Sequence, residues 1–387
     1  MSAPQLTTKL PRVGTTVFSV MSALATQHNA INLGQGFPDF DCDPRLIDAV
    51  SDAMRQGHNQ YPLMTGVPLL RERVAQKMEL IHGVRYDPQT EVTITSGATQ
   101  GILSAILAVV RAGDEVIVLE PCYDSYSPNI ELAGGVPIPV RLTADSFDVD
   151  WDALSAAITS RTRAIIVNSP HNPSGRVWTA ADWDRLAELI GHREIWVLAD
   201  EVYEHMVFDH QDHMSAARHP LIRDRAYVIS SFGKTFHVTG WKIGTVCAPA
   251  PLTTEFRKVH QYTVFTANSA MQHGIATYLG DPAPYLNLPA FYQAKRDRFA
   301  AGLTGLPLKL LPCEGSYFQC VSYADVPVLR DFGERECCEW LTREVGVTPI
   351  PVSAFYSSAA EQKTIRFCFA KQDATLDAAL SRLALLR

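Results

Sequence analysis

The segment SSFGKTFHVTGWKIG, residues 230–244, is the part of the sequence from which the fold is best inferred. It follows the apolar run 226–229, which has the length of a buried strand, and it places Lys234 in a turn rich in serine and glycine. A second lysine, Lys242, follows shortly afterwards. A lysine on a rigid turn at a strand end suits Schiff-base formation, because desolvation and a nearby cation keep part of its amine neutral. A surface turn with two basic residues would explain the segment equally well, so the interpretation depends on the rest of the chain.

The composition is that of an ordinary globular protein. The chain has 387 residues, of which 47% are hydrophobic and 19% charged, enough for a large core and more than one domain. A formal charge of −7, without any run rich in lysine and arginine, argues against nucleic acid as a partner. Residues 1–9 do not have the pattern of a signal peptide, and no apolar run is long enough to suggest a membrane span. We therefore expect a cytoplasmic protein that does not contact a membrane.

The cysteines and histidines indicate neither a disulfide framework nor a metal site. Eight cysteines are scattered without a Cys-x-x-Cys pair, so reduced and mostly buried thiols are expected. The nearest approach to a cluster of metal ligands is His205, Asp209, His210 and His213. A polar loop explains these residues as well as a metal does, and we expect no metal.

A candidate anion site lies upstream of the lysine segment. Residues 91–95 alternate as a strand, residues 96–99 form a turn, and residues 100–111 have the apolar spacing of a helix. Free backbone N–H groups and the helix dipole point at one spot in such a connection. Any tight connection between a strand and a helix could look like this, so the turn gains meaning only from its position before Lys234.

Polar and aromatic side chains follow three further predicted strands, over residues 114–119, 163–167 and 195–199. These side chains are Tyr123 after the first strand, Asn168 and Asn172 after the second, and Asp200 and Tyr203 after the third. A carboxylate at the end of an apolar strand must be paired or hydrogen-bonded, because burying it bare costs several kcal/mol. Strands that alternate with helices and carry functional residues at their carboxyl ends are typical of an open, mainly parallel α/β sheet. The order of these side chains argues for one site.

The C-terminal third of the chain predicts a second, smaller α/β unit. A helix near residues 286–298 leads out of the first unit, and residues 309–321 begin the second. In the strand 363–369, Arg366 lies among apolar neighbours. An arginine in that setting needs a carboxylate to form a bidentate pair, either from a ligand or from an internal salt bridge.

Taken together, these motifs resemble the fold-type I aminotransferases that use pyridoxal phosphate. The matching segments are SFGKTFHVTGWK at 231–242, NSPHNPSG at 168–175, DEVYEH at 200–205 and FPDF at 37–40, with Tyr61 opening the YPLMTGVPLLR motif of 61–71. The resemblance spans essentially the whole chain and is closest to bacterial methionine aminotransferases and the kynurenine and glutamine transaminase K group. One departure is Lys242, because many wider relatives have arginine there, which would offer a bidentate fork to phosphate.

The resemblance implies a role in cofactor binding for several residues. Lys234 carries pyridoxal phosphate as a Schiff base and acts as catalytic base, Asp200 pairs with the pyridine nitrogen, and Tyr203 donates to the phenolate oxygen. The other implied cofactor contacts are Gly97, Ala98, Thr99, Ser231 and Lys242 at the phosphate, Tyr123 stacked on the ring, Asn172 at the phenolate oxygen, and Tyr61 from the partner subunit of a homodimer. A tyrosine packed in a loop is the alternative for Tyr61.

The resemblance also implies the substrate contacts. Arg366 binds the carboxylate that amino and oxo acids share, with Gly36 and Asn172 nearby, and Phe18 and Phe265 line the side-chain pocket, Phe265 from the partner subunit. Core packing is the alternative for Phe265. No second arginine for a distal carboxylate is identifiable, which favours methionine, glutamine or aromatic amino acids.

The expected activity is therefore transfer of an amino group from such an L-amino acid to a 2-oxo acid. The main alternative is a carbon–sulfur β-lyase, which uses the same residues and eliminates a β-substituent. The resemblance places the N-terminal arm and part of the small domain in residues 1–44. It assigns residues 45–285 to the large cofactor-binding domain and residues 286–387 to the small C-terminal domain.

Overall fold

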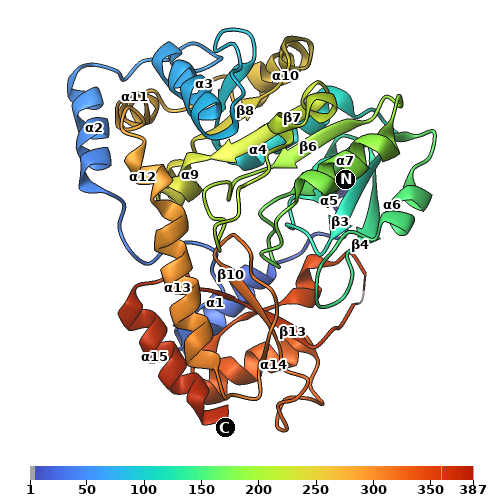
Figure 1. Ribbon diagram of the computed structural model, residues 1–387, viewed down its shortest axis with the longest axis vertical. Helices are drawn as coiled ribbons and strands as arrows, with labels where there is room; N and C mark the ends of the chain where they lie inside the picture. Colours follow the sequence, from blue (N-terminus) through green and yellow to red (C-terminus); the bar gives the residue numbers. More distant parts are fainter. Residues whose placement is uncertain (1–4, 359, 387) are drawn as a thin grey trace.

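A seven-stranded sheet forms the centre of the computed structural model, which describes residues 5–358 and 360–386 (Figure 1). The strand order is β2-β8-β7-β6-β5-β3-β4, and only β8 runs against the others. The bounds are β2 (Val92–Thr95), β3 (Glu115–Glu120), β4 (Val136–Arg141), β5 (Thr162–Asn168), β6 (Trp196–Asp200), β7 (Ala226–Ser231) and β8 (Gly244–Cys247). The carboxyl ends of β5, β6 and β7 therefore meet at one edge of the sheet.

Helices cover both faces of this sheet, because neighbouring residues of its strands pack into two different cores. In β3, Val116 packs on the side of α4, α5 and α10, whereas Ile117 packs in the larger core that includes α3 and α7. Runs that are apolar on both faces are typical of buried parallel strands. The helices of this part are α2 (Pro44–Arg55), α3 (Pro68–His82), α4 (Gly97–Val109), α5 (Tyr126–Leu132), α6 (Trp151–Ala157), α7 (Ala180–Ile190), α8 (Pro220–Arg223), α9 (Phe232–Thr235), α10 (Ala250–Thr263), α11 (Ser269–Tyr278) and α12 (Ala283–Leu286).

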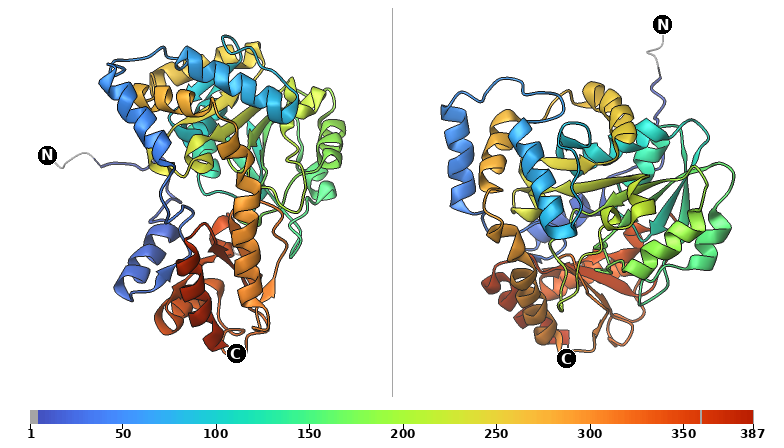
Figure 2. Two further views of the ribbon diagram at one scale, coloured as in Figure 1. Left: turned by 60° about the vertical axis from the view of Figure 1, so that its left-hand side comes forward. Right: turned by 45° about the horizontal axis from the view of Figure 1, so that its top comes forward.

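The chain then leaves the central sheet through the long helix α13 (Leu288–Leu303), which leads to a second group of elements (Figures 1 and 2). A four-stranded antiparallel sheet has the order β12-β13-β10-β9, and β1 pairs in parallel with β11. The bounds are β1 (Ile31–Asn32), β9 (Lys309–Leu310), β10 (Phe318–Ser322), α14 (Glu334–Trp340), β11 (Val347–Thr348), β12 (Ile350–Pro351), β13 (Thr364–Cys368) and α15 (Asp373–Leu383). The mixed α/β architecture and the mainly parallel sheet were both predicted; the division at residues 44 and 285 stays a prediction.

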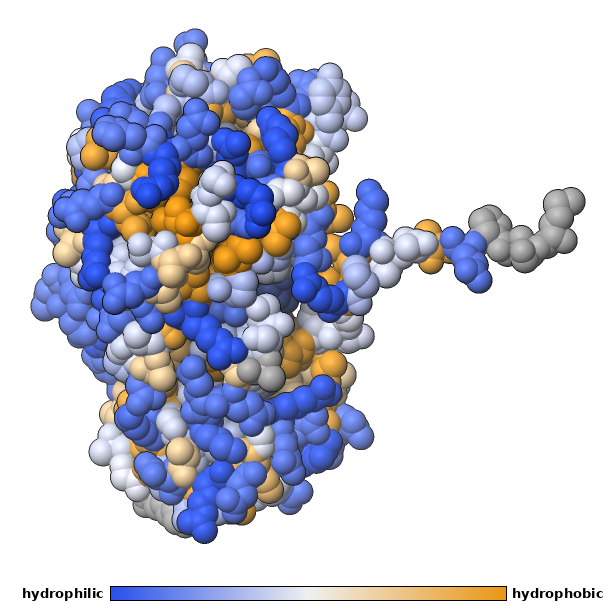
Figure 3. All heavy atoms as spheres, turned by 90° about the vertical axis from the view of Figure 1, so that its right-hand side faces the viewer, coloured by the Kyte–Doolittle hydropathy of each residue, from blue (hydrophilic) through white to orange (hydrophobic). Residues whose placement is uncertain are grey.

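The N-terminal arm is more ordered than the sequence suggested, because it contains helix α1 (Val17–Gln27). The Thr16 hydroxyl caps this helix by accepting from the Ser19 backbone N–H, and Met21 and Ala25 are buried one turn apart. The helix packs beside β11 and β12, so the arm belongs with the C-terminal elements. Before α1, the first described residues stand away from the body of the molecule (Figures 2 and 3). Leu6, in this segment, is fully exposed.

Two general expectations can be compared with the structure. All eight cysteines are free, and most of them are buried, as predicted. None of the helices within the described ranges has both the length and the apolar character needed to cross a membrane.

Candidate active site

A cavity of about 260 Å³ lies where β5, β6 and β7 end and α4 begins. Segments of the N-terminal arm and of the second sheet close it from the other side. The predicted site residues that line it are Phe18, Gly36, Ala98, Thr99, Tyr123, Asn172, Asp200, Tyr203, Ser231, Lys234, Lys242 and Arg366. The structure thus gathers most of the predicted residues around one space.

Lys234 is half-buried on the single turn of α9 that follows β7. Its Nζ donates to the carbonyl of Gly36 at 3.1 Å and to the hydroxyl of Tyr317 at 2.9 Å. Burial lowers the pKa of Lys234 to about 8, and the neighbouring cations Lys242 and Arg366 act in the same direction. A substantial fraction of this amine is therefore neutral near physiological pH, as a nucleophile or general base requires.

Asp200 is buried at the end of β6 and has neutral donors. The Tyr126 hydroxyl donates to its Oδ2 at 2.6 Å, and the Val202 backbone N–H lies 3.4 Å from its Oδ1. Burial raises the pKa of Asp200 to about 6, and the hydrogen bond from Tyr126 counteracts this rise. A buried carboxylate with only neutral donors favours a cationic group in the adjoining cavity.

The start of α4 and the exposed Lys242 form an anion-binding corner. Helix α4 has no side-chain cap at its N-terminus, and its residues Ala98 and Thr99 line the cavity. A Cβ atom on Gly97, which has a φ of +75°, would lie 3.2 Å from Lys242 Nζ. Glycine therefore lets the helix start and this cation approach each other, and the uncapped N–H groups and the positive charge suit a phosphate.

Arg366 lies on β13 across the cavity and is 1% exposed. Its Nη1 donates to Asn172 Oδ1 at 2.7 Å, its Nη2 donates to the Gly34 carbonyl at 2.8 Å, and its guanidinium stacks on Phe318 at 3.9 Å. Its buried Nε has no hydrogen-bond partner within the described residues. In those residues the arginine forms no ion pair, so its own neighbours leave it able to bind a ligand carboxylate.

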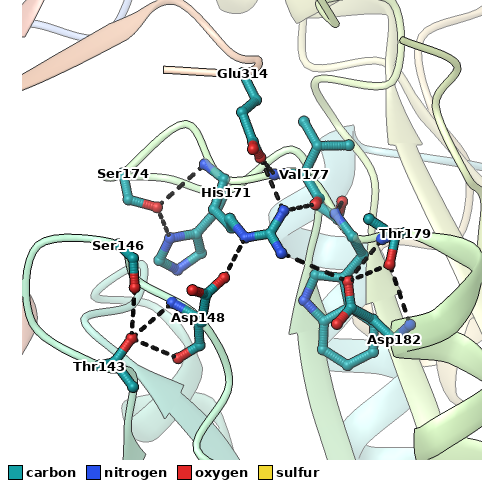
Figure 4. A network of polar contacts seen from close by, with 12 residues as sticks. Thr143, Ser146, Asp148, His171, Ser174, Val177, Thr179, Asp182 and Glu314 are labelled. Atoms are coloured by element: carbon teal, nitrogen blue, oxygen red, sulfur yellow. Dashed lines mark hydrogen bonds and ion pairs between the residues drawn. The ribbon is translucent and has the colours of Figure 1, made fainter. Parts of the chain in front are cut away.

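A polar network supports the loop that carries Asn172 (Figure 4). His171 Nδ1 lies 2.7 Å from the Ser174 hydroxyl, and Glu314 accepts from the Val177 backbone N–H at 2.9 Å. Asn168 also holds the loop, because its Oδ1 accepts from the Asn172 backbone N–H at 2.8 Å. The network joins this loop to the segment that precedes β10.

Three of the predicted residues do not line the cavity. Gly97 lies directly behind it at the start of α4. Tyr61 and Phe265 are 78% and 42% exposed, and their rings contact each other at 5.2 Å on the surface. Within one chain, these two aromatic residues therefore form a separate surface pair.

Two residues near the functional groups were not predicted. Tyr126 follows Tyr123 by three positions at the start of α5, and this helical spacing was a usable signal. Tyr317 had no such signal, because its contacts Lys234 and Gly36 are distant in the sequence.

Three of the four residues considered as possible metal ligands have other partners. His205 lies 3.3 Å from Lys77 Nζ, Asp209 pairs with Arg296, and His213 Nε2 lies 2.8 Å from Glu201. His205 and His213 are buried, so a polar loop describes them poorly.

Comparison with known proteins agrees with this geometry. The family model for aminotransferase class I and II matches residues 28–383. The methionine aminotransferase of Escherichia coli K12 is 50% identical over 376 residues, with 97% of each chain covered. Kynurenine–oxoglutarate transaminase 3 of Rattus norvegicus is 35% identical, over 94% of this chain and 86% of its own. A crystal structure of an Escherichia coli protein with a methionine aminotransferase function has a TM-score of 0.96 and 48% identity, covering 99% of this chain and 100% of that one.

These matches extend over nearly the whole chain and include the lysine segment, the asparagine loop and the strand-end aspartate. They confirm both the predicted fold type and the predicted class of enzyme. The chain is a transaminase and belongs to the family of class I and II aminotransferases.

Proposed function

We propose that this enzyme transfers the amino group of methionine, or of another L-amino acid with an apolar or aromatic side chain, to a 2-oxo acid, with pyridoxal phosphate as cofactor. One observation carries the proposal. A single cavity combines a lysine of lowered pKa, a buried aspartate with neutral donors and a buried arginine that has no ion pair within the described residues.

The residues present fit this cofactor. The phosphate would be held by Ser231, Lys242 and the N–H groups at the start of α4 from Gly97 to Thr99. Asp200 would face the pyridine nitrogen, and its charge favours the protonated ring. The remaining contacts of the ring would be Tyr123 on its face and Asn172 and Tyr203 at its phenolate oxygen. When bound, pyridoxal phosphate supplies an aldehyde carbon that receives the amino group and a ring that withdraws electrons from the reacting bonds.

The protein's own residues account for binding and proton transfer. Arg366 binds the carboxylate that both substrates share, and Asn172 holds the guanidinium in place through the 2.7 Å hydrogen bond. Lys234 Nζ in its neutral form takes the proton from the substrate Cα and holds it as an ammonium until it is returned. Segments of the arm and of the second sheet line one side of the cavity and reduce the access of water to these charges.

The residues that line the cavity favour a substrate with an apolar side chain. Phe18, Phe37 and Phe318 line the cavity, and Arg366 is its one lining arginine among the described residues. Among the described residues that line the cavity, a distal carboxylate would therefore find no second guanidinium, whereas a thioether makes favourable contacts with aromatic rings. The methionine activity of the relative from Escherichia coli agrees with this choice.

We also propose a homodimer in which Tyr61 and Phe265 reach the partner's cavity. Their exposed ring pair supports this assignment, because large aromatic side chains in contact on a surface favour an interface.

The test is to add L-methionine alone to the purified enzyme and follow both the absorbance of the cofactor and the oxo acid released. We expect a yellow protein that loses its visible band while one equivalent of oxo acid forms. Lys234→Ala should abolish both signals. Methionine without effect, while an acidic amino acid such as aspartate reacts, would contradict the substrate class. Pyruvate and ammonia formed from a cysteine conjugate without any oxo-acid acceptor would point instead to the β-lyase.

A further inference from the structure

The hydroxyl of Tyr317 lies between the amine of Lys234 and the carbonyl of Gly36. It is 2.9 Å from Lys234 Nζ and 2.5 Å from the Gly36 oxygen, which itself lies 3.1 Å from Lys234 Nζ. Tyr317 is fully buried, directly before β10. Three distant segments therefore meet at one amine.

The proton positions in this triangle follow from the chemistry of the groups. A carbonyl oxygen only accepts, so the Tyr317 O–H must donate to Gly36. The hydroxyl oxygen then has only lone pairs to offer to Lys234, and it accepts one N–H bond of the amine. The Gly36 carbonyl accepts a second one.

A neutral primary amine has two N–H bonds and one lone pair. Tyr317 and Gly36 engage both N–H bonds, so the lone pair is directed away from them, and Lys234 lines the cavity. We propose that Tyr317 is a positioning residue that, with the Gly36 carbonyl, aims the basic lone pair of Lys234 at the substrate Cα. The proton taken from that carbon becomes the third N–H of the ammonium, so the two existing hydrogen bonds persist. This inference rests on the proposed function, in which Lys234 is the base.

Tyr317 is held firmly enough for this role. Its ring packs against those of Tyr203 at 5.0 Å and Phe318 at 4.8 Å. The residues before it are tied down as well, because the Ser316 N–H donates to the Met206 carbonyl at 2.8 Å and Glu314 joins the network of Figure 4. The Tyr317 hydroxyl is therefore held in one position and restricts the movement of the Lys234 amine.

The chain offers a matched control in Tyr292. This tyrosine is also fully buried, its ring lies 5.8 Å from that of Tyr317, and its hydroxyl has no hydrogen-bond partner within the described residues. Tyr317→Phe and Tyr292→Phe therefore remove the same atom from the same aromatic cluster. Only the first removes an acceptor from Lys234.

The experiment compares the two variants with L-methionine and its α-deuterated form. For Tyr317→Phe we expect kcat to fall about 10- to 100-fold, the range for loss of a hydrogen bond to a group that becomes charged, with KM unchanged within about twofold. The deuterium isotope effect on kcat should rise, because proton transfer from Cα becomes slower than the other steps. Tyr292→Phe should match the wild type in all three quantities.

A second measurement does not depend on turnover. In the full chain freed of cofactor, acylation of Lys234 across pH, read by peptide mass spectrometry, should have its midpoint near pH 8 in the wild type. Loss of the acceptor destabilises the ammonium, so Tyr317→Phe should lower that midpoint by about one unit. Tyr292→Phe should leave it in place.

An unchanged isotope effect and an unchanged labelling midpoint in Tyr317→Phe would overturn the inference. If that variant does not fold, Tyr317→Met also lacks the hydroxyl and carries the same test. Failure of the proposed function is distinct, because the wild-type enzyme itself would then not react with methionine.

Discussion

Asp200 and Arg366 are buried charges on opposite walls of one cavity, and both have neutral hydrogen-bond partners in the chain. The two residues differ in whether burial can remove their charge. The pKa of Asp200 rises to about 6, so this carboxyl can become neutral in mild acid. Burial also lowers the pKa of Arg366, but a guanidinium stays charged at any pH at which the protein is folded. The charge of Asp200, on the wall formed by the central sheet, therefore depends on pH. Arg366, on the opposite wall, always presents a cation to an anionic ligand.

Of the two residues, Arg366 should have the larger effect on activity when it is replaced. Arg366→Lys keeps the positive charge but loses the planar fork, so we expect kcat/KM to fall about 100-fold for amino and oxo acids alike, mostly through KM. Steady-state kinetics with several donors and acceptors would measure this. Arg257→Lys is the control, because Arg257 also donates to neutral oxygens, those of Thr93, Gln89 and Val92. A loss limited to thermal stability would mean that Arg366 is only structural.

The pH-dependent charge of Asp200 should affect the stability of the folded chain. The pKa of Asp200 is about 6 in the folded chain and 3.8 in the free group. Ionisation of this carboxyl therefore lowers the free energy of unfolding as the pH rises from about 4 to 6, and the loss reaches ~3 kcal/mol above pH 6. In the cofactor-free chain, Asp200→Asn should raise the free energy of unfolding by up to that amount at pH 7.5. Urea unfolding would measure this gain, which should vanish below about pH 4.

Asp377→Asn provides the contrast for this experiment. Asp377 forms an exposed ion pair with Arg298, and its pKa is lowered through that hydrogen bond. Its replacement should give no gain at any pH. A gain that is the same at pH 4 and pH 7.5 for Asp200→Asn would show that its charge is not the cause.

The two walls also differ in how far the sequence could predict them. Asp200, Asn172 and Lys234 each stand within a few residues of a buried apolar strand, so a local pattern located them and the parallel sheet brought them together. Arg366 was recognised in the same way, as a charge in an apolar strand. These predictions succeed because the signal and the structure that positions it are neighbours in the chain.

The parts that escaped prediction depend on distant contacts or on a weak pattern. Tyr317 meets Lys234 and Gly36 only because β10, α9 and the arm converge, and nothing near residue 317 reveals that meeting. Helix α1 was missed although Val17, Met21 and Leu24 have helical spacing, since the apolar stripe is short and no acidic residue marks its first turn. Its place is fixed by packing beside β11 and β12.

The smallest effect should come from the pair outside the cavity. Tyr61→Phe removes one hydroxyl that we assign to the partner's phosphate, so cofactor affinity should weaken about tenfold. Tyr262→Phe, on a side chain that is 89% exposed, should leave the affinity unchanged. A heterodimer of one Lys234→Ala chain and one Tyr61→Phe chain separates the two arrangements. If Tyr61 acts across the interface, the site that retains Lys234 receives an intact tyrosine and binds the cofactor like the wild type. If Tyr61 acts within its own chain, that site carries the weakened affinity, and the assigned dimer contact is wrong.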